Sequence, residues 1–146
     1  MRTPANIAGH PIHPMIVPLP IGLWVFSFVC DIISHFAADP ATWQLVALYT
    51  MIGGIVGALL AAVFGLIDLL SLPAGPIRGT AIKHMSLNLT IVVLFVINAW
   101  LRIADRATTA GFWLSLIAIL LLLVSGWLGG KMVYTAGVAV DTSQSA

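Results

Sequence analysis

One group of residues has the side chains needed to bind a redox cofactor or a metal ion. It contains His10, His13, Asp68, His84 and Asn88. Imidazole nitrogens bind haem iron and transition metals, and a carboxylate can orient such an imidazole from behind. These residue types predict a cofactor site. The cofactor is either haem b or a metal ion bound by the three histidines, and a protein with no cofactor is the remaining alternative.

A second polar group lies within strongly apolar sequence and contains Asp31, His35, Asn98 and Arg102. An ionised side chain in hydrocarbon is costly, so these residues should turn inward and find partners. Because a helix rises about 1.5 Å per residue, counting along antiparallel spans places Asp31 and Asn98 at a similar depth. Two interpretations stay open: a buried polar clasp that fixes the bundle, or a small ion or proton pathway.

The composition predicts an integral membrane protein. Apolar residues make up 60% of the sequence and charged residues 8%, with a mean hydropathy of +1.08. Residues 17–36, 43–69, 84–101 and 112–134 are each apolar and long enough to cross a bilayer, which takes about 20 helical residues. Short connections favour antiparallel neighbours. We therefore predict an all-α fold, a transmembrane up-and-down four-helix bundle, over residues 17–135. A His/Pro-rich segment (1–16) precedes it and a polar tail (136–146) follows.

The positive charges favour an orientation with both termini in the cytoplasm. Four spans place the termini and the middle loop on one side, and cytoplasmic loops carry an excess of Lys and Arg. The side with the termini carries four positive charges, Arg2, Arg78, Lys83 and Lys131. The opposite side carries two, Arg102 and Arg106. The five tryptophans fall mostly near span ends, as in an interfacial aromatic belt.

His10 and His13 each precede a proline, which favours extended or polyproline geometry. In a polyproline helix the two imidazoles would face the same way but lie about 9 Å apart. Each should then have a different partner, such as Asp68 or His84, unless a turn brings the two histidines together on one metal.

Small residues recur at four-residue steps in the second span, at Gly53, Gly57, Ala61 and Gly65. Such a stripe lets another backbone approach closely. It indicates helix packing within the chain, or a docking surface for a homo-oligomer or a larger membrane complex.

Several motifs together resemble a known family. They are Gly9-His10-Pro-x-His13-Pro, Pro20-Ile-Gly22-Leu-Trp24 followed by Asp31, Asp68, His84 with Asn88, and Ser125-Gly126-x-Leu-Gly129-Gly130-x-x-Val-Tyr134 followed by Gly137-Val138. Over nearly its whole length the chain is similar to the bacterial membrane family called domain of unknown function 2231. That family is grouped by remote similarity with two-haem cytochrome b membrane proteins. The resemblance implies a location in the bacterial inner membrane and a redox role.

The histidine count limits what this resemblance can mean here. A low-spin haem needs two axial ligands, and the outer half of the bundle offers only His35. The sequence supports at most one haem near the cytoplasmic face, bound by His84 and either His13 or His10. Three functions stay open: an electron-transfer module, a structural or partner-binding subunit without cofactor, and an ion pathway. No hydrolytic motif is present, and the net charge of +1 disfavours nucleic-acid binding.

Overall fold

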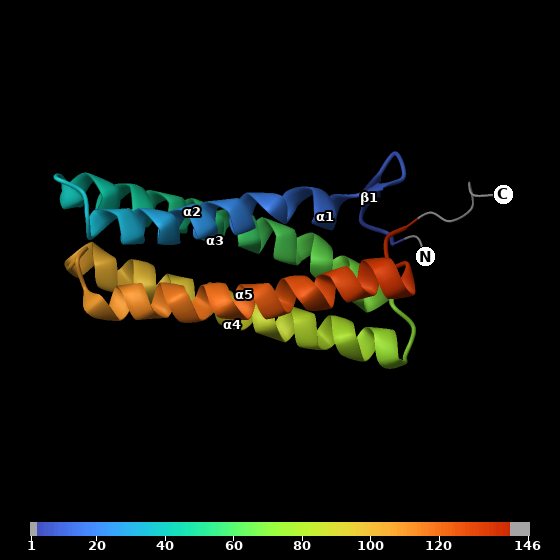
Figure 1. Cartoon of the computed structure of the whole chain (residues 1–146). Coiled ribbons are helices and arrows are strands. Elements are labelled where there is room, and N and C mark those ends of the chain that lie inside the picture. The colour runs from blue at the N-terminus through green and yellow to red at the C-terminus, as the bar shows by residue number, and fades with distance from the viewer. Residues whose placement is uncertain (1–2, 141–146) are drawn as a thin grey trace.

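The computed structural model describes residues 3–140, and most of them are in helices that run side by side (Figure 1). The helices are α1 (Ile12–Ile16), α2 (Pro18–Ser34), α3 (Pro40–Ser71), α4 (Pro76–Ala104) and α5 (Thr109–Ala136). Before them, strand β1 (Asn6–Ile7) pairs antiparallel with β2 (His10–Pro11). The tight turn between the strands has positive φ at Ala8 and Gly9 (50° and 83°).

Within this described part, four helical segments are long and apolar enough to cross a membrane. They are Ile12–Ser34, Pro40–Ser71, Pro76–Ala104 and Thr109–Ala136. Large apolar side chains cover the outer surface, for example Leu59, Val93 and Leu123, which are 50%, 55% and 68% exposed. Hydrocarbon tolerates such a surface, whereas water would not. The predicted all-α transmembrane four-helix bundle is therefore confirmed.

The helices extend further into the connections than the hydropathy predicted. Residues 71–83 were expected to be a loop, but α4 already begins at Pro76. Proline suits the first turn of a helix, because the backbone N–H that it lacks would be unpaired there. At its other end α4 continues to Ala104, so Arg102 is a buried helical residue and not part of a loop. It therefore does not count among the charges that indicate orientation.

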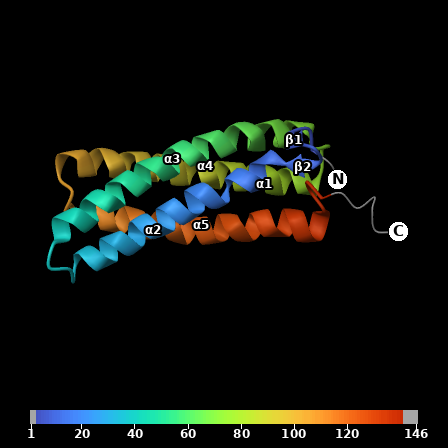
Figure 2. The same ribbon diagram turned by 90° about the horizontal axis from the view of Figure 1, so that it is seen from above.

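The bundle has two ends that differ in their polar residues (Figures 1 and 2). We call one the His end; it holds the β1–β2 hairpin, α1, the α3–α4 connection and the end of α5. The opposite end, with the α2–α3 and α4–α5 connections, is the ion-pair end. Helices α2 and α5 contact each other, and in Figure 2 the ribbons of α1 and α5 diverge toward the His end.

The core is built around Trp24, which is only 3% exposed. Its ring stacks on Phe95 with centroids 4.5 Å apart, and its Nε1–H donates to the Met51 carbonyl at 3.2 Å. Gly54 makes room for the ring, since a Cβ there would lie 2.4 Å from it. The belt interpretation was thus wrong for Trp24. It agrees with the exposed rings of Trp100, Trp113 and Trp127.

The small-residue stripe of α3 packs against α1 and α2 of the same chain. A Cβ on Gly57 would lie 3.2 Å from Pro20, and one on Gly53 would lie 3.3 Å from Leu23. Further along, Ala61 is buried and a Cβ on Gly65 would lie 2.9 Å from the His13 ring. The chain's own helices therefore fill this groove, and a partner protein could dock there only by displacing them.

Candidate functional site

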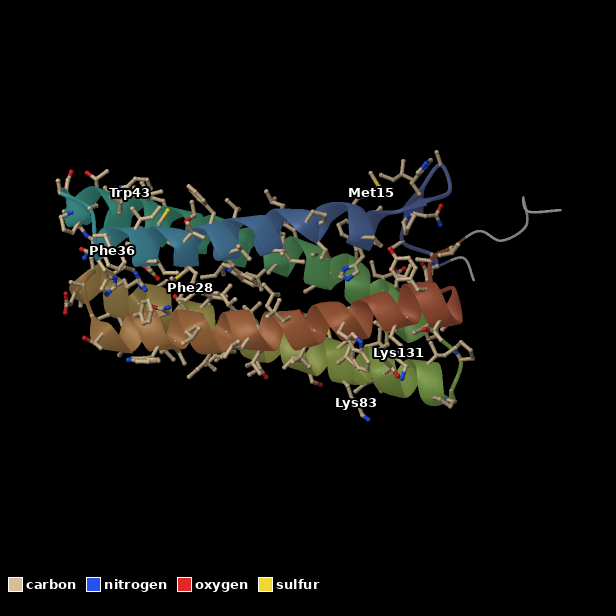
Figure 3. The ribbon with its side chains drawn as sticks, in the orientation of Figure 1. Met15, Phe28, Phe36, Trp43, Lys83 and Lys131 are labelled. Carbon is tan, nitrogen blue, oxygen red and sulfur yellow. The ribbon has the colours of Figure 1, made fainter. Side chains whose placement is uncertain are left out.

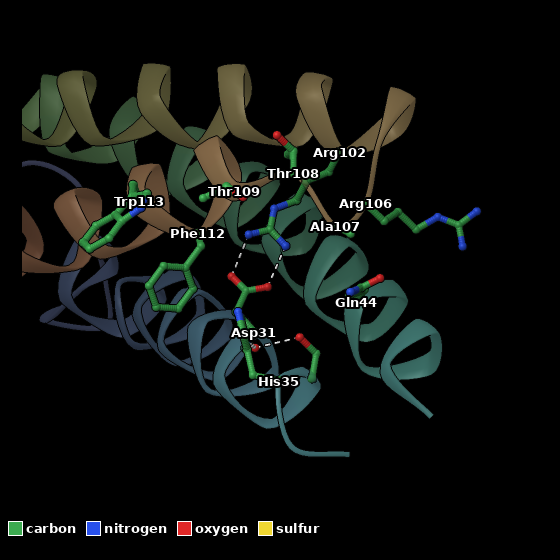
Figure 4. A pocket seen from close by; sticks show the side chains of 11 residues that line it. Asp31, His35, Gln44, Arg102, Arg106, Ala107, Thr108, Thr109, Phe112 and Trp113 are labelled. Atoms are coloured by element: carbon green, nitrogen blue, oxygen red, sulfur yellow. Dashed lines mark hydrogen bonds and ion pairs between the residues drawn. The ribbon is translucent and has the colours of Figure 1, made fainter. Parts of the chain in front are cut away.

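At the ion-pair end, the carboxylate of Asp31 from α2 faces the guanidinium of Arg102 from α4 (Figure 4). Arg102 Nη1 and Nη2 donate to the two Asp31 carboxylate oxygens at 2.6 and 2.7 Å. Both residues are almost completely buried, at 3% and 2% exposure. Parallel charge-assisted bonds of this kind are the strongest that a guanidinium makes, and they fix its orientation. Among the partners considered for Asp31, Arg102 is thus the one that binds its carboxylate.

Asn98 continues this network into the bundle. Its Oδ1 accepts from Arg102 Nε at 2.8 Å, and its Nδ2 donates to the Gly111 carbonyl and to Ser115 Oγ, each at 2.8 Å. Gly111 leaves the necessary space, since a Cβ there would lie 2.9 Å from both Arg102 and Asn98. The network therefore joins α2, α4 and α5 through paired polar atoms, as the clasp interpretation requires.

His35 lies at the border of this network, with its Nδ1 2.8 Å from the Asp31 backbone carbonyl. A carbonyl only accepts, so Nδ1 carries the proton. The ring packs edge-on against Phe112 at 5.4 Å. A half-open cavity of about 440 Å³ lies here; Asp31, His35 and Arg102 line it together with Gln44, Phe112 and the α4–α5 connection (Figure 4).

At the His end, His13 reaches across to α3. The expected extended geometry was wrong for this residue, because α1 begins at Ile12 and includes His13 and Pro14. Pro14 is tolerated in the first turn, where its missing N–H costs no helical hydrogen bond. His13 Nδ1 donates to the Ala61 carbonyl at 2.8 Å, and the ring lies against Gly65.

His84 of α4 is held in a similar way by α5. Its Nδ1 lies 3.0 Å from both the carbonyl and the hydroxyl oxygen of Ser125, so Nδ1 carries the proton. Ser125 Oγ donates to Asn88 Oδ1, and Asn88 Nδ2 donates to His84 Nε2 at 3.1 Å. A Cβ on Gly129 would lie 3.3 Å from the ring.

The remaining candidates at this end do not join the two imidazoles. His10 lies in β2, where it is exposed and its Nδ1 donates to the Ala8 carbonyl at 3.2 Å. Asp68 Oδ1 accepts the Ala5 backbone N–H at 3.1 Å and so ties the N-terminal segment to α3. Within residues 3–140, no group of three or more His, Cys, Asp or Glu side chains is placed to hold a metal ion. The structure therefore does not bring His10, His13 and His84 together as one cluster.

A family model described as predicted membrane protein (DUF2231) matches residues 9–142. The chain belongs to the DUF2231 family. No curated protein and no solved structure matches it significantly. The match covers all four membrane-spanning helices of this DUF2231 protein and both polar groups.

The sequence did not reveal several groups that complete the two sites of this DUF2231 protein. The backbone carbonyls of Ala61 and Gly111 are acceptors that no side-chain pattern marks. Ser115 was visible only as a small polar residue on the inner face of its helix, and Ser125 as such a residue and as part of the glycine-rich motif. Gln44 gave no signal at all. Arg2 and most of the polar tail, residues 141–146, lie outside the described residues.

Proposed function

We propose that this protein is a membrane electron-transfer module that binds one b-type haem at its His end, where His13 and His84 are the residues that would hold it. The observation that carries the proposal is the state of the two imidazoles. Each donates its Nδ1–H to a backbone carbonyl of a neighbouring helix, Ala61 for His13 and Ser125 for His84. This arrangement fixes the tautomer in which Nε2 has the lone pair, as in metal-binding and haem-binding histidines.

The surroundings of the two rings fit the same role. Gly65 and Gly129 leave room for an imidazole, because a Cβ on Gly65 would lie only 2.9 Å from the His13 ring and a Cβ on Gly129 would lie 3.3 Å from the His84 ring. The two histidines come from α1 and α4, so a group bound by both would join the first half of the bundle, α1 to α3, to the second half, α4 and α5. His13 is favoured over His10, because the His10 ring is exposed in β2 and is bound to its own hairpin.

Asn88 and Asp68 have supporting roles in this proposal. Asn88 and Ser125 hold the His84 ring in a closed set of hydrogen bonds. Iron binding would exchange the Asn88 hydrogen bond at Nε2 for a metal–nitrogen bond. Asp68 anchors the backbone at Ala5, and thereby holds the segment that leads into α1 and His13. When bound, haem supplies one-electron redox chemistry, and the chain supplies the ligands and their orientation.

The test is the visible spectrum of protein purified after expression with added haem precursor. We expect a Soret band that shifts on reduction in the wild type. His13→Ala and His84→Ala should lose it or convert it to a high-spin form. His10→Ala and His35→Ala are matched controls, which remove the other two histidines and should keep the wild-type spectrum.

Two results would contradict the proposal. One is a wild-type protein without a Soret band, in which case elemental analysis would decide whether a metal ion binds instead. The other is a wild-type band that persists unchanged in His13→Ala and His84→Ala, which would indicate that haem adheres without these ligands.

We also propose that the His end faces the cytoplasm of a bacterial inner membrane. Lys83 and Lys131 lie at this end (Figure 3), as does Arg78, whereas the ion-pair end has Arg106 outside its buried network. Cytoplasmic loops attract such an excess of positive charge. Fusions of a fluorescent protein and of alkaline phosphatase to the C-terminus should give fluorescence and no phosphatase activity; the opposite result would refute this orientation.

A further inference from the structure

The cavity at the ion-pair end contains hydrogen-bond donors that the protein itself does not use. In the described chain, the Asp31 carboxylate already receives two bonds from Arg102, and the third donor of Arg102 goes to Asn98. Within residues 3–140, the Gln44 amide and the Arg106 guanidinium form no hydrogen bond. Both residues line the cavity. A ligand that accepts hydrogen bonds could therefore use both of these donor groups.

The charges that line the cavity have the same implication. Asp31 and Arg102 neutralise each other, so the cavity lining has a net charge of one positive unit, which Arg106 carries. The nearby acids Asp39 and Asp105 do not line it, and each carboxylate accepts bonds within its own loop, from Thr42 and Ala107. The start of α5 adds a partial positive charge at the same place.

The geometry points to a binding site for a phosphate-type oxyanion in this cavity. The volume of about 440 Å³ is within the range of small-ligand sites. Gln44 and Thr109 would donate to the oxyanion from two helices, while the aromatic ring of Phe112 forms one wall. The Arg106 side chain lies at the rim and extends away from Asp31 (Figure 4), so it can rotate over a bound anion without breaking a hydrogen bond to the described part of the chain.

The oxyanion could be a soluble phosphate or the phosphate of a lipid headgroup, because the cavity lies at the end of the membrane-spanning helices. Two titrations separate these sources. Delipidated protein in an uncharged detergent is titrated with inorganic phosphate, and separately with short-chain phosphatidylglycerol below its micelle concentration. Sodium chloride at matched ionic strength is the reference. The shift of the thermal unfolding midpoint reports binding.

We expect saturable stabilisation by one of the two probes. Arg106→Gln should weaken that binding at least about tenfold, since a charge-assisted hydrogen bond is lost, and Arg106→Lys should restore part of it. Gln44→Leu should weaken it about fivefold through the loss of a neutral donor. Lys131→Gln, which removes an exposed cation at the opposite end, is the matched control and should bind like the wild type.

The probe that saturates identifies the source of the oxyanion. The proposal is overturned if neither probe stabilises the protein beyond chloride, or if Lys131→Gln weakens binding as much as Arg106→Gln does. Circular dichroism of each variant verifies that the helices are intact. Arg106 is exposed, so its substitution should not disturb the fold.

Discussion

Replacement of one partner of the buried ion pair should destabilise the bundle far more than replacement of both. Arg102→Met leaves the Asp31 carboxylate buried without its two short bonds, and Asp31→Leu leaves the guanidinium unpaired. The cost of such a buried unpaired charge is about 3–5 kcal/mol. Arg102→Met also removes the donor to Asn98 Oδ1, which adds about 1 kcal/mol.

The double variant removes both charges and keeps the volume apolar. Exchange of a buried ion pair for apolar residues is often neutral or stabilising. We therefore expect its free energy of unfolding to lie within about 2 kcal/mol of the wild type. Unfolding by a denaturing detergent in mixed micelles, followed by circular dichroism, measures these differences. Lys83→Met, which removes an exposed cation from α4, should change stability by less than about 0.5 kcal/mol.

Two outcomes would refute this reasoning. If each single variant is as stable as the wild type, the ion pair does not hold the helices together. If the double variant loses as much stability as the two single variants combined, the charges act independently.

Ion flux in proteoliposomes then separates the two interpretations of Asp31, a buried clasp and an ion pathway. If Asp31 lies on an ion pathway, the wild type conducts ions and Asp31→Asn abolishes the flux. If Asp31 only holds the helices together, the wild type shows no flux.

Three further predictions concern packing and helix capping. Gly65→Ala should cost about 1–3 kcal/mol relative to Gly126→Ala, because its Cβ would meet the His13 ring at 2.9 Å, whereas a Cβ on Gly126 meets nothing within 4 Å; thermal unfolding of both variants measures this difference. Gly54→Ala should cost about 1–3 kcal/mol or more by the same measurement, since its Cβ would lie 2.4 Å from a buried indole that cannot retreat. Hydrogen bonds from a threonine side chain and backbone at the start of α3 lower the pKa of Asp39, so its capping contribution is present at neutral pH and is lost as the pH falls through that lowered pKa; the stability difference between wild type and Asp39→Ala should shrink in acid, and a difference independent of pH would contradict the assignment.

The spans could be predicted from the sequence because hydrocarbon imposes one strict demand, a continuous apolar surface around a hydrogen-bonded backbone. The predicted helix ends were misplaced because this demand applies only within the hydrocarbon layer and not at the ends of the helices. Hydropathy follows side chains, whereas a helix ends where its backbone bonding ends. Helix α4 continues past the apolar region at both ends, and Pro76 rather than a change in polarity marks its start.

Partner choice among the buried polar residues was harder to predict. Depth counting placed Asp31 level with Asn98, but the carboxylate binds Arg102, which lies one helical turn further along α4. The arginine side chain is long enough to reach back by a turn, and its fork matches both carboxylate oxygens. Asn98 instead binds the guanidinium and α5. Residue spacing therefore finds the group, while side-chain length and donor geometry decide the pairs within it.

The two histidine–proline pairs show how tertiary contacts decide local geometry. The dipeptide rule applies to His10, which is extended in β2, and fails for His13, which is helical within α1 although a proline follows it. The difference lies in what each segment can contact. His13 gains a bond to the Ala61 carbonyl and a place against Gly65, both on α3, whereas His10 finds only its own hairpin. Because these contacts lie about fifty residues away in sequence, no local pattern could have separated the two histidines.

The two ends of the bundle differ in how much hydrogen-bonding capacity they leave open. At the ion-pair end the buried charges satisfy each other, and the unused donors lie outside them, in the cavity beside Gln44 and Arg106. At the His end the backbone satisfies the Nδ1 side of both imidazoles. The Nε2 atom of His13 is left for a ligand, whereas that of His84 accepts from Asn88, a bond that a ligand would replace. A closed ion pair suits stability, whereas imidazoles with a fixed tautomer suit coordination. This contrast is the reason to look for a cofactor beside His13 and His84 and not beside Asp31.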